Sequence, residues 1–128
     1  MDEKSLNAIL NSPILGYAYH RIVVDADGMP VDYIFLEVNN AFENLTGLVK
    51  ENIINKSIKE SVPEILSGGF DWIAYYGDVA LNGHEKEFDE YSQPLNKWYR
   101  VHVYSPVKYY FVTLFMDISE ISTNKVTK

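Results

Sequence analysis

The order of strand-like and helix-like segments predicts an α+β domain with one five-stranded antiparallel sheet and short helices gathered on one face. Two runs rich in β-branched and aromatic residues come first, short helical segments follow, and three further strand-like runs close the chain. Strands and helices that come in separate blocks are typical of α+β folds. At 128 residues, the chain has the length of one domain with one hydrophobic core.

A short amphipathic helix is predicted at the N-terminus, within residues 1–12. Leu6, Ile9 and Leu10 fall on one side of this helix. The helix must end before Pro13, because proline disfavours helical geometry in the residue that precedes it. A helix this short is not stable alone in water, so we expect its apolar side to pack against another surface.

An antiparallel hairpin is predicted next. The runs from Gly16 to Val24 and from Asp32 to Val38 are mostly aromatic and β-branched, and this composition favours strands. Between them, residues 25–30 are Asp-Ala-Asp-Gly-Met-Pro, which favour a turn. Two strand-like runs joined by a short turn that contains glycine indicate a hairpin.

The middle of the chain is predicted to be helical in short pieces. Asn40 and Glu43 can satisfy free amide groups at the start of a two-turn helix that ends at Gly47. Residues 50–60 predict irregular helical turns, because a proline and a glycine pair follow closely. Residues 70–83 carry apolar side chains at helical spacing and are expected to form the longest internal helix. Gly77 within it is interpreted as a site of close packing on the sheet.

Three strands are predicted to close the domain, at residues 84–92, 95–105 and 108–116. The last strand is apolar on both faces: one carries Phe111, Thr113 and Phe115, and the other carries Val112, Leu114 and Met116. An antiparallel sheet with one face in water alternates apolar and polar residues. We therefore expect both faces to be covered, one by the helices and the other by the N-terminal helix or a second subunit.

Composition and charge exclude several classes of function. With 11 basic and 18 acidic residues, the net charge is −7, so we expect no nucleic-acid partner and no direct membrane contact. The absence of cysteine removes disulfides, thiolate nucleophiles and zinc–thiolate sites. The N-terminus lacks the features of a secretory signal, and the longest apolar run, residues 109–116, is too short to span a membrane. A cytoplasmic location is expected.

Two stretches of the sequence resemble PAS sensor domains. Residues 38–47, Val-Asn-Asn-Ala-Phe-Glu-Asn-Leu-Thr-Gly, are similar to the PAS passage from strand to helix. Residues 98–103 and 111–120 resemble the last two PAS strands and the Asp-Ile-Thr exit motif, with Ser119 in place of the usual threonine. The resemblance implies a PAS-like (profilin-like) domain over residues 13–120. Residues 1–12 then form a flanking helix, and residues 121–128 begin a linker to an output domain outside this chain.

The resemblance implies a sensory and signal-transduction module rather than an enzyme. Such domains commonly regulate a covalently linked output domain, as in the histidine kinases of two-component systems or in diguanylate cyclases, and any catalysis would belong to that output domain. They commonly dimerise, which implies a homodimer interface that includes Leu6, Ile9, Leu10, Val112, Leu114 and Met116. The signal would leave the domain at Asp117 and Ser119, where the last strand continues into an exit helix.

The resemblance also implies a small organic ligand between the sheet and the helices, held by Phe42, Tyr75, Val101, Phe111, Thr113 and Phe115. The identity of this ligand stays open, and so does the alternative of a ligand-free dimerisation or protein-interaction module. Haem is disfavoured, because the axial histidine that haem-sensing members use on the long internal helix is missing from residues 70–82. A flavin or bilin attached through cysteine is disfavoured, because the chain has no cysteine, and non-covalent flavin stays open as a minor option.

The remaining chemistry-bearing residues do not form a catalytic or metal-binding pattern. His20, His84 and His102 are scattered and are interpreted as strand or loop side chains rather than metal ligands. The acids at positions 25, 27, 85, 87, 89 and 90 are interpreted as a solvated face. A small α+β enzyme stays a third hypothesis, which a buried carboxylate with a strongly raised pKa beside a pocket would support.

Overall fold

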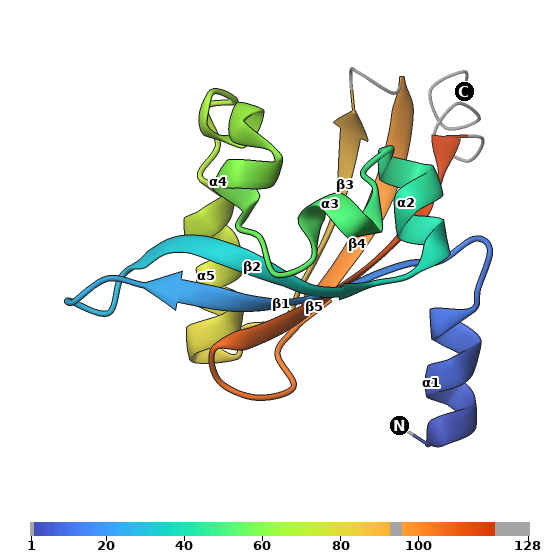
Figure 1. Ribbon diagram of the computed structural model, residues 1–128, viewed down its shortest axis with the longest axis horizontal. Helices are drawn as coiled ribbons and strands as arrows, with labels where there is room; N and C mark the ends of the chain where they lie inside the picture. The colour runs from blue at the N-terminus through green and yellow to red at the C-terminus, as the bar shows by residue number, and fades with distance from the viewer. Residues whose placement is uncertain (1, 93–95, 120–128) are drawn as a thin grey trace.

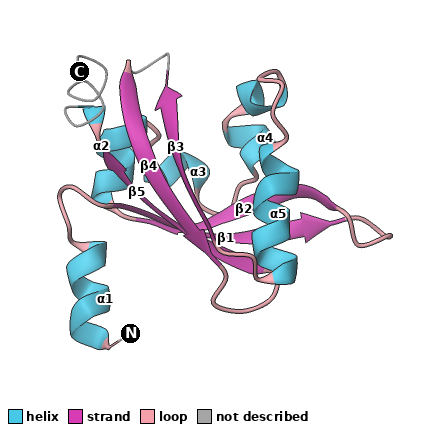
Figure 2. Cartoon of the chain, turned by 180° about the vertical axis from the view of Figure 1, so that it is seen from behind, coloured by secondary structure: helices cyan, strands magenta, loops and turns pink. Residues whose placement is uncertain are grey.

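The computed structural model describes residues 2–92 and 96–119 of the chain (Figure 1). Within these ranges, an N-terminal helix precedes a β-hairpin, short helical segments follow, and three strands close the chain (Figures 1 and 2). The elements in chain order are α1 (Glu3–Leu10), β1 (Gly16–Val24), β2 (Pro30–Val38), α2 (Asn40–Thr46), α3 (Lys50–Ile53), α4 (Ile58–Ser61), η1 (Pro63–Leu66), α5 (Trp72–Asn82), β3 (Lys86–Ser92), β4 (Lys97–Tyr104) and β5 (Tyr110–Asp117).

The strands form one five-stranded antiparallel sheet in the order β2-β1-β5-β4-β3. The first and last strands, β1 and β5, are therefore neighbours in the middle of the sheet, and Gly16 pairs with Phe115. This pairing joins the N-terminal hairpin to the C-terminal strands. The predicted α+β fold is confirmed, and each strand begins and ends within two residues of its predicted bounds.

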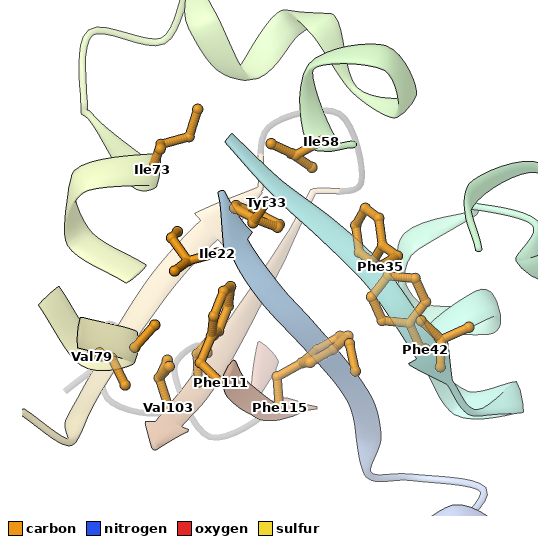
Figure 3. Close-up of a cluster of buried hydrophobic side chains, with 14 of the residues drawn as sticks. Ile22, Tyr33, Phe35, Phe42, Ile58, Ile73, Val79, Val103, Phe111 and Phe115 are labelled. Atoms are coloured by element: carbon orange, nitrogen blue, oxygen red, sulfur yellow. The ribbon is translucent and has the colours of Figure 1, made fainter. Parts of the chain in front are cut away.

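The core lies between one face of the sheet and helices α2 to α5 (Figure 3). The strands contribute alternate residues, among them Ala18, Ile22, Tyr33, Phe35, Val101, Val103, Phe111 and Phe115. The helices contribute Phe42, Ile53, Ile58, Ile73 and Val79. Phe111 is fully buried, and the rings of His20 and Tyr76 stack on it with centroids 4.3 Å and 5.1 Å away.

Gly77 allows α5 to lie close to the sheet. A Cβ atom at this position would be 2.6 Å from the Cβ of Pro30 at the start of β2, much closer than two carbon atoms pack. The predicted close packing is confirmed. The predicted helix ends are also observed, since Gly47 and Gly83 end α2 and α5 with φ angles of 77° and 73°, a conformation that favours glycine.

Asn39, rather than the predicted Asn40, caps the start of α2. The Asn39 Oδ1 accepts hydrogen bonds from the N–H groups of Phe42 at 2.9 Å and Tyr17 at 3.0 Å, and its Nδ2 donates to the Leu15 carbonyl at 2.9 Å. Asn39 is buried and Asn40 is exposed, because α2 begins at Asn40, immediately after the capping residue. The side chain of Asn39 therefore ties α2 to the start of β1.

Replacement of Asn39 by alanine is expected to lower the free energy of unfolding by about 2–4 kcal/mol, through loss of a helix cap and of hydrogen bonds to buried groups. Urea unfolding followed by circular dichroism measures this loss. Asn40→Ala is the matched control, expected to change stability by less than about 0.5 kcal/mol. Equal losses in the two variants would contradict the capping role of Asn39.

The structure describes a helix at the N-terminus and ends its description at residue 119. The predicted N-terminal helix is present as α1, and it stands apart from the sheet (Figure 1). The side chains of Leu6, Ile9 and Leu10 lie outside the described residues, as does the predicted linker at 121–128. None of the described helices is long and apolar enough to cross a membrane.

Candidate functional site

A cavity of about 250 Å³ lies between the sheet and the helices. All five strands contribute to its lining, and so do α2, α4 and α5. The strand residues that line it are His20, Tyr33, Phe35, Glu90, Tyr99, Val101, Thr113 and Phe115. The lining is mostly aromatic and aliphatic with a few polar groups, which is typical of sites for small molecules.

Four of the six residues predicted to hold a ligand line this cavity together: Phe42, Val101, Thr113 and Phe115. The strand alternation places Val101, Thr113 and Phe115 on the inner face. Helix α2 brings Phe42 against Phe115, with ring centroids 5.7 Å apart. Their role in binding a ligand stays a prediction.

The other two residues of that set, Phe111 and Tyr75, lie outside the cavity lining. Phe111 is on the inner face of β5 but fills the core beneath Tyr76 of α5. Tyr75 packs edge-on against Phe88 and Trp72, with centroids 5.4 Å and 5.7 Å away. Tyr76, the next residue along α5, is the tyrosine that reaches the cavity.

His20 is a buried polar residue of the lining, with 3% of its surface exposed. It lies in a strand, as predicted, and its ring meets Tyr33 edge-on at 5.1 Å. Its Nδ1 is 3.4 Å from the carbonyl oxygen of Phe111. Burial lowers the pKa of His20 to about 3, because an apolar environment disfavours the charged imidazolium. His20 is therefore a neutral polar group at physiological pH.

Tyr33 and Tyr76 place two hydroxyl groups at the cavity. Their rings meet edge-to-face with centroids 5.7 Å apart, and within the described part of the chain neither hydroxyl has a hydrogen-bond partner. Burial raises the pKa of both hydroxyls, and the negative charge of Glu90 adds to this effect. Both tyrosines therefore stay neutral.

Glu90 lies on the inner face of β3 and is exposed to solvent, as are the other acids of the predicted solvated face. On the outer side of the strand, Asp89 pairs with Arg100 at 2.9 Å, and Glu87 approaches His102 at 3.4 Å. Glu90 lies opposite Tyr99 and lines the cavity. Burial raises the pKa of Glu90. Glu90 is exposed to solvent, unlike the enclosed carboxyl that the enzyme hypothesis requires.

The predicted exit residues are tied to β4. The Ser119 N–H donates to Asp117 Oδ1 at 2.8 Å, and the Ser119 hydroxyl accepts from the N–H of Trp98 at 3.0 Å. The pKa of Asp117 is held below its usual value by hydrogen bonds from Ser119, with a further contribution from Lys97. Ile118 is buried and donates its N–H to the Trp98 carbonyl at 2.8 Å. These hydrogen bonds join residues 117–119 to the start of β4.

The outer face of β5 is shielded in part by the chain's own tyrosines. Val112 lies between Tyr19 and Tyr104 in the sheet and is buried, so it needs no separate cover. Leu114 is half-buried, and Met116 is exposed. The predicted interface at these residues stays a prediction, because α1 stands apart from the sheet in the single chain (Figure 1).

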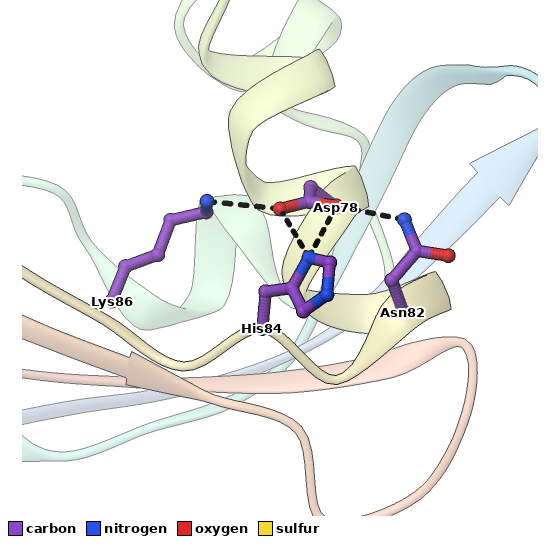
Figure 4. Close-up of polar contacts among 4 residues, drawn as sticks. All are labelled: Asp78, Asn82, His84 and Lys86. Carbon is purple, nitrogen blue, oxygen red and sulfur yellow. Dashed lines mark hydrogen bonds and ion pairs between the residues drawn. The ribbon is translucent and has the colours of Figure 1, made fainter.

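Asp78, near the end of α5, joins this helix to β3 on the protein surface (Figure 4). Its carboxylate accepts from Asn82 Nδ2 at 2.7 Å and from Lys86 Nζ at 2.9 Å, and it lies 3.0 Å from His84 Nδ1. The hydrogen bonds from Asn82 and Lys86 hold the pKa of Asp78 far below its usual value. None of these four residues lines the inner cavity, so we assign the cluster a structural role.

A larger depression of about 450 Å³ lies on the surface beside the turn before α5. Two of its lining residues, Leu66 and Phe70, are mostly exposed, at 61% and 49%. Its lining lacks the buried polar side chains that the inner cavity has. The inner cavity is therefore the stronger candidate site.

Solved structures share this arrangement of strands and helices. An RNA-binding light-oxygen-voltage receptor is 16% identical, with a TM-score of 0.60 over 95% of this chain and 34% of the receptor. The LOV protein of Rhodobacter sphaeroides is 12% identical, with a TM-score of 0.50 over 95% of this chain and 74% of that protein. The PAS domain of an HTR-like protein from Haloarcula marismortui is 21% identical, with a TM-score of 0.43 over 92% of this chain and all of that domain.

The first two likenesses show that the chain has the PAS fold, as the sequence resemblance predicts. The chain spans about a third of the length of the light-oxygen-voltage receptor. No family model matches the sequence, and no curated protein is similar enough to count as a match.

The cavity is small for a ligand site. Pockets for drug-sized ligands measure about 300–1,000 Å³, whereas this cavity measures about 250 Å³. The smaller space suits a ligand with a single ring, since a cavity of about 150 Å³ already holds benzene.

Proposed function

We propose that the chain is a sensory module that binds a small organic molecule in the inner cavity and signals to a linked output domain. The observation that carries this proposal is a cavity whose aromatic walls also hold polar groups, the hydroxyls of Tyr33 and Tyr76, without hydrogen-bond partners in the described chain. Polar groups of a ligand would satisfy these hydroxyls, and the rings would bury its apolar part.

The last strand offers a direct route from the cavity to the exit. Thr113 and Phe115 line the cavity, and the same strand continues to Asp117. A ligand that binds one position of β5 better than another shifts the population toward that position. The output domain, such as a histidine kinase, lies outside this chain, and any catalysis belongs to it.

Thermal unfolding in the presence of single-ring organic compounds tests the proposal. A compound at 100 times its Kd is expected to stabilise the folded protein by about 2.7 kcal/mol. Val101→Phe fills the cavity from β4 and is expected to abolish this stabilisation. The control, His102→Phe, adds a ring at the next position on the outer face and is expected to retain it. A response that persists in Val101→Phe, or is absent from the wild type for every compound, contradicts ligand binding in the cavity.

Homodimerisation is a second candidate function, favoured by the outer face of the sheet. Leu114 is half-buried and Met116 exposed at the end of β5, while α1 stands apart from the sheet (Figure 1). In the sequence, Leu6, Ile9 and Leu10 recur at the spacing of one helix face. We propose that α1 of one copy covers this outer face of a second copy.

Light scattering at micromolar concentration tests the dimer. The wild type is expected to be dimeric, and Leu114→Asp monomeric, because a charge would be buried in the interface. Val107→Asp introduces the same charge at an exposed loop position and is expected to leave the dimer intact. A monomeric wild type excludes the proposed interface.

A further inference from the structure

We propose that the inner cavity is selective for small organic cations, such as protonated amines with a single ring, and that Glu90 receives the cationic group. This inference rests on the proposed function and adds the chemical class of the ligand. It follows from the charge of the lining, its aromatic rings and its unpartnered hydroxyls.

The lining carries one negative charge and no positive one. Glu90 is its one ionised residue, since lysine and arginine are absent from it and His20 is neutral. The nearby cations have other partners: Lys86 binds Asp78 at 2.9 Å, and Arg100 binds Asp89 on the outer face. Glu90 makes no hydrogen bond or ion pair with the described residues. The field in the cavity therefore attracts a cation and repels a carboxylate.

The aromatic walls also favour a cation. Rings of Tyr33, Phe42, Tyr76 and Tyr99 line the space, and the face of an aromatic ring attracts a positive charge within about 6 Å. An ammonium group has three N–H donors and no acceptor. The carboxylate of Glu90 and the hydroxyl oxygens of Tyr33 and Tyr76 can accept from it, whereas the Tyr99 hydroxyl already donates to the Leu45 carbonyl at 2.8 Å.

Glu90 is exposed to solvent but also lines the cavity, and partial desolvation raises its pKa. The charged form therefore lacks full stabilisation in the absence of a cation. A cation beside the carboxylate supplies that stabilisation. Binding is therefore expected to weaken as the pH falls and Glu90 becomes protonated, while the facing groups Tyr33, Tyr76, Tyr99 and His20 stay neutral.

Three probes of matched size test the inference: benzylamine, benzyl alcohol and benzoate, which are cationic, neutral and anionic at pH 7. Their affinities for the wild-type protein are measured by isothermal titration calorimetry. Benzylamine is expected to bind about tenfold more tightly than benzyl alcohol, through the ion pair and the ring faces. Benzoate is expected to bind most weakly.

Glu90→Gln removes the charge and keeps the shape. In this variant the preference for benzylamine is expected to fall to the part that the ring faces supply, about threefold or less, with the affinity for benzyl alcohol unchanged within about twofold. Glu87→Gln removes a charge from the outer face of the same strand and is expected to keep the preference for benzylamine. Equal affinities in the wild type overturn the cation selectivity, and an undiminished preference in Glu90→Gln overturns the role of Glu90, while in both cases the cavity remains a ligand site. Absence of binding for all three probes contradicts the proposed function itself, and the cation selectivity with it.

Discussion

Acidification from pH 6.5 toward pH 3 is expected to destabilise the folded protein by about 1.4 kcal/mol per pH unit through His20 alone. The pKa of His20 is lowered from 6.5 to about 3 in the folded protein. Below pH 6.5 the unfolded chain therefore binds a proton that the folded protein does not. The stabilisation is complete above pH 6.5 and is lost as the pH falls through this window.

Urea unfolding of the wild type and of His20→Gln at matched pH values measures this effect. Glutamine at position 20 does not titrate, so its stability curve is expected to be shallower by about 1.4 kcal/mol per pH unit. Asp78 and Asp117, whose pKa values are lowered, lose their stabilisation only below 3.8. Glu90, whose pKa is raised, gains stability on acidification, and its contribution is the same in both proteins. Parallel curves would show that His20 is not buried in its neutral form.

Replacement of Phe111 by alanine is expected to lower the free energy of unfolding by about 3–5 kcal/mol, the usual loss for a buried phenylalanine. Phe111 is fully buried in the middle of the sheet, and the rings of His20 and Tyr76 stack on it. Its removal leaves a cavity and deprives both rings of a partner. Guanidinium unfolding measures the loss, with Phe111→Leu as a milder variant that keeps most of the apolar volume.

Met29→Ala is the control for this prediction. Met29 lies in the turn between β1 and β2 with 60% of its surface exposed, so its truncation is expected to lower stability by less than about 1 kcal/mol. Similar losses at the two positions would contradict the central place of Phe111 in the core.

The architecture was predictable because it depends on local spacing. Alternation along β5 placed Thr113 and Phe115 on one face and Val112 on the other, and the structure has them so. The end of α2 at Gly47 was predictable for a similar reason, since a left-handed residue there favours glycine. The choice between Asn39 and Asn40 as the helix cap was not predictable, because the Asn39 side chain is held by contacts with Leu15 and Tyr17, which lie more than 20 residues away in the sequence.

The cavity was predictable only in part, because packing decides which inner residues face open space. Phe111 and Thr113 share one face of β5, yet α5 closes over Phe111 while Thr113 lines the cavity. The close approach of α5 depends on Gly77 and Pro30, which lie far apart in the sequence. The sequence places His20 and Glu90 on strands, but their position in the cavity lining depends on how the helices pack against the sheet.

The position of a bound ligand tests the sensory proposal most directly. Nuclear Overhauser effects between benzylamine and the methyl groups of the wild-type protein report which face of β5 it touches. Thr113 and Val101 line the inner cavity. Leu114 follows Thr113 on β5 and lies on the opposite face of the sheet. We expect effects at the methyl groups of Thr113 and Val101 and none at Leu114. Effects confined to Leu114 and Val112 would place the ligand on the outer face and contradict the proposed site.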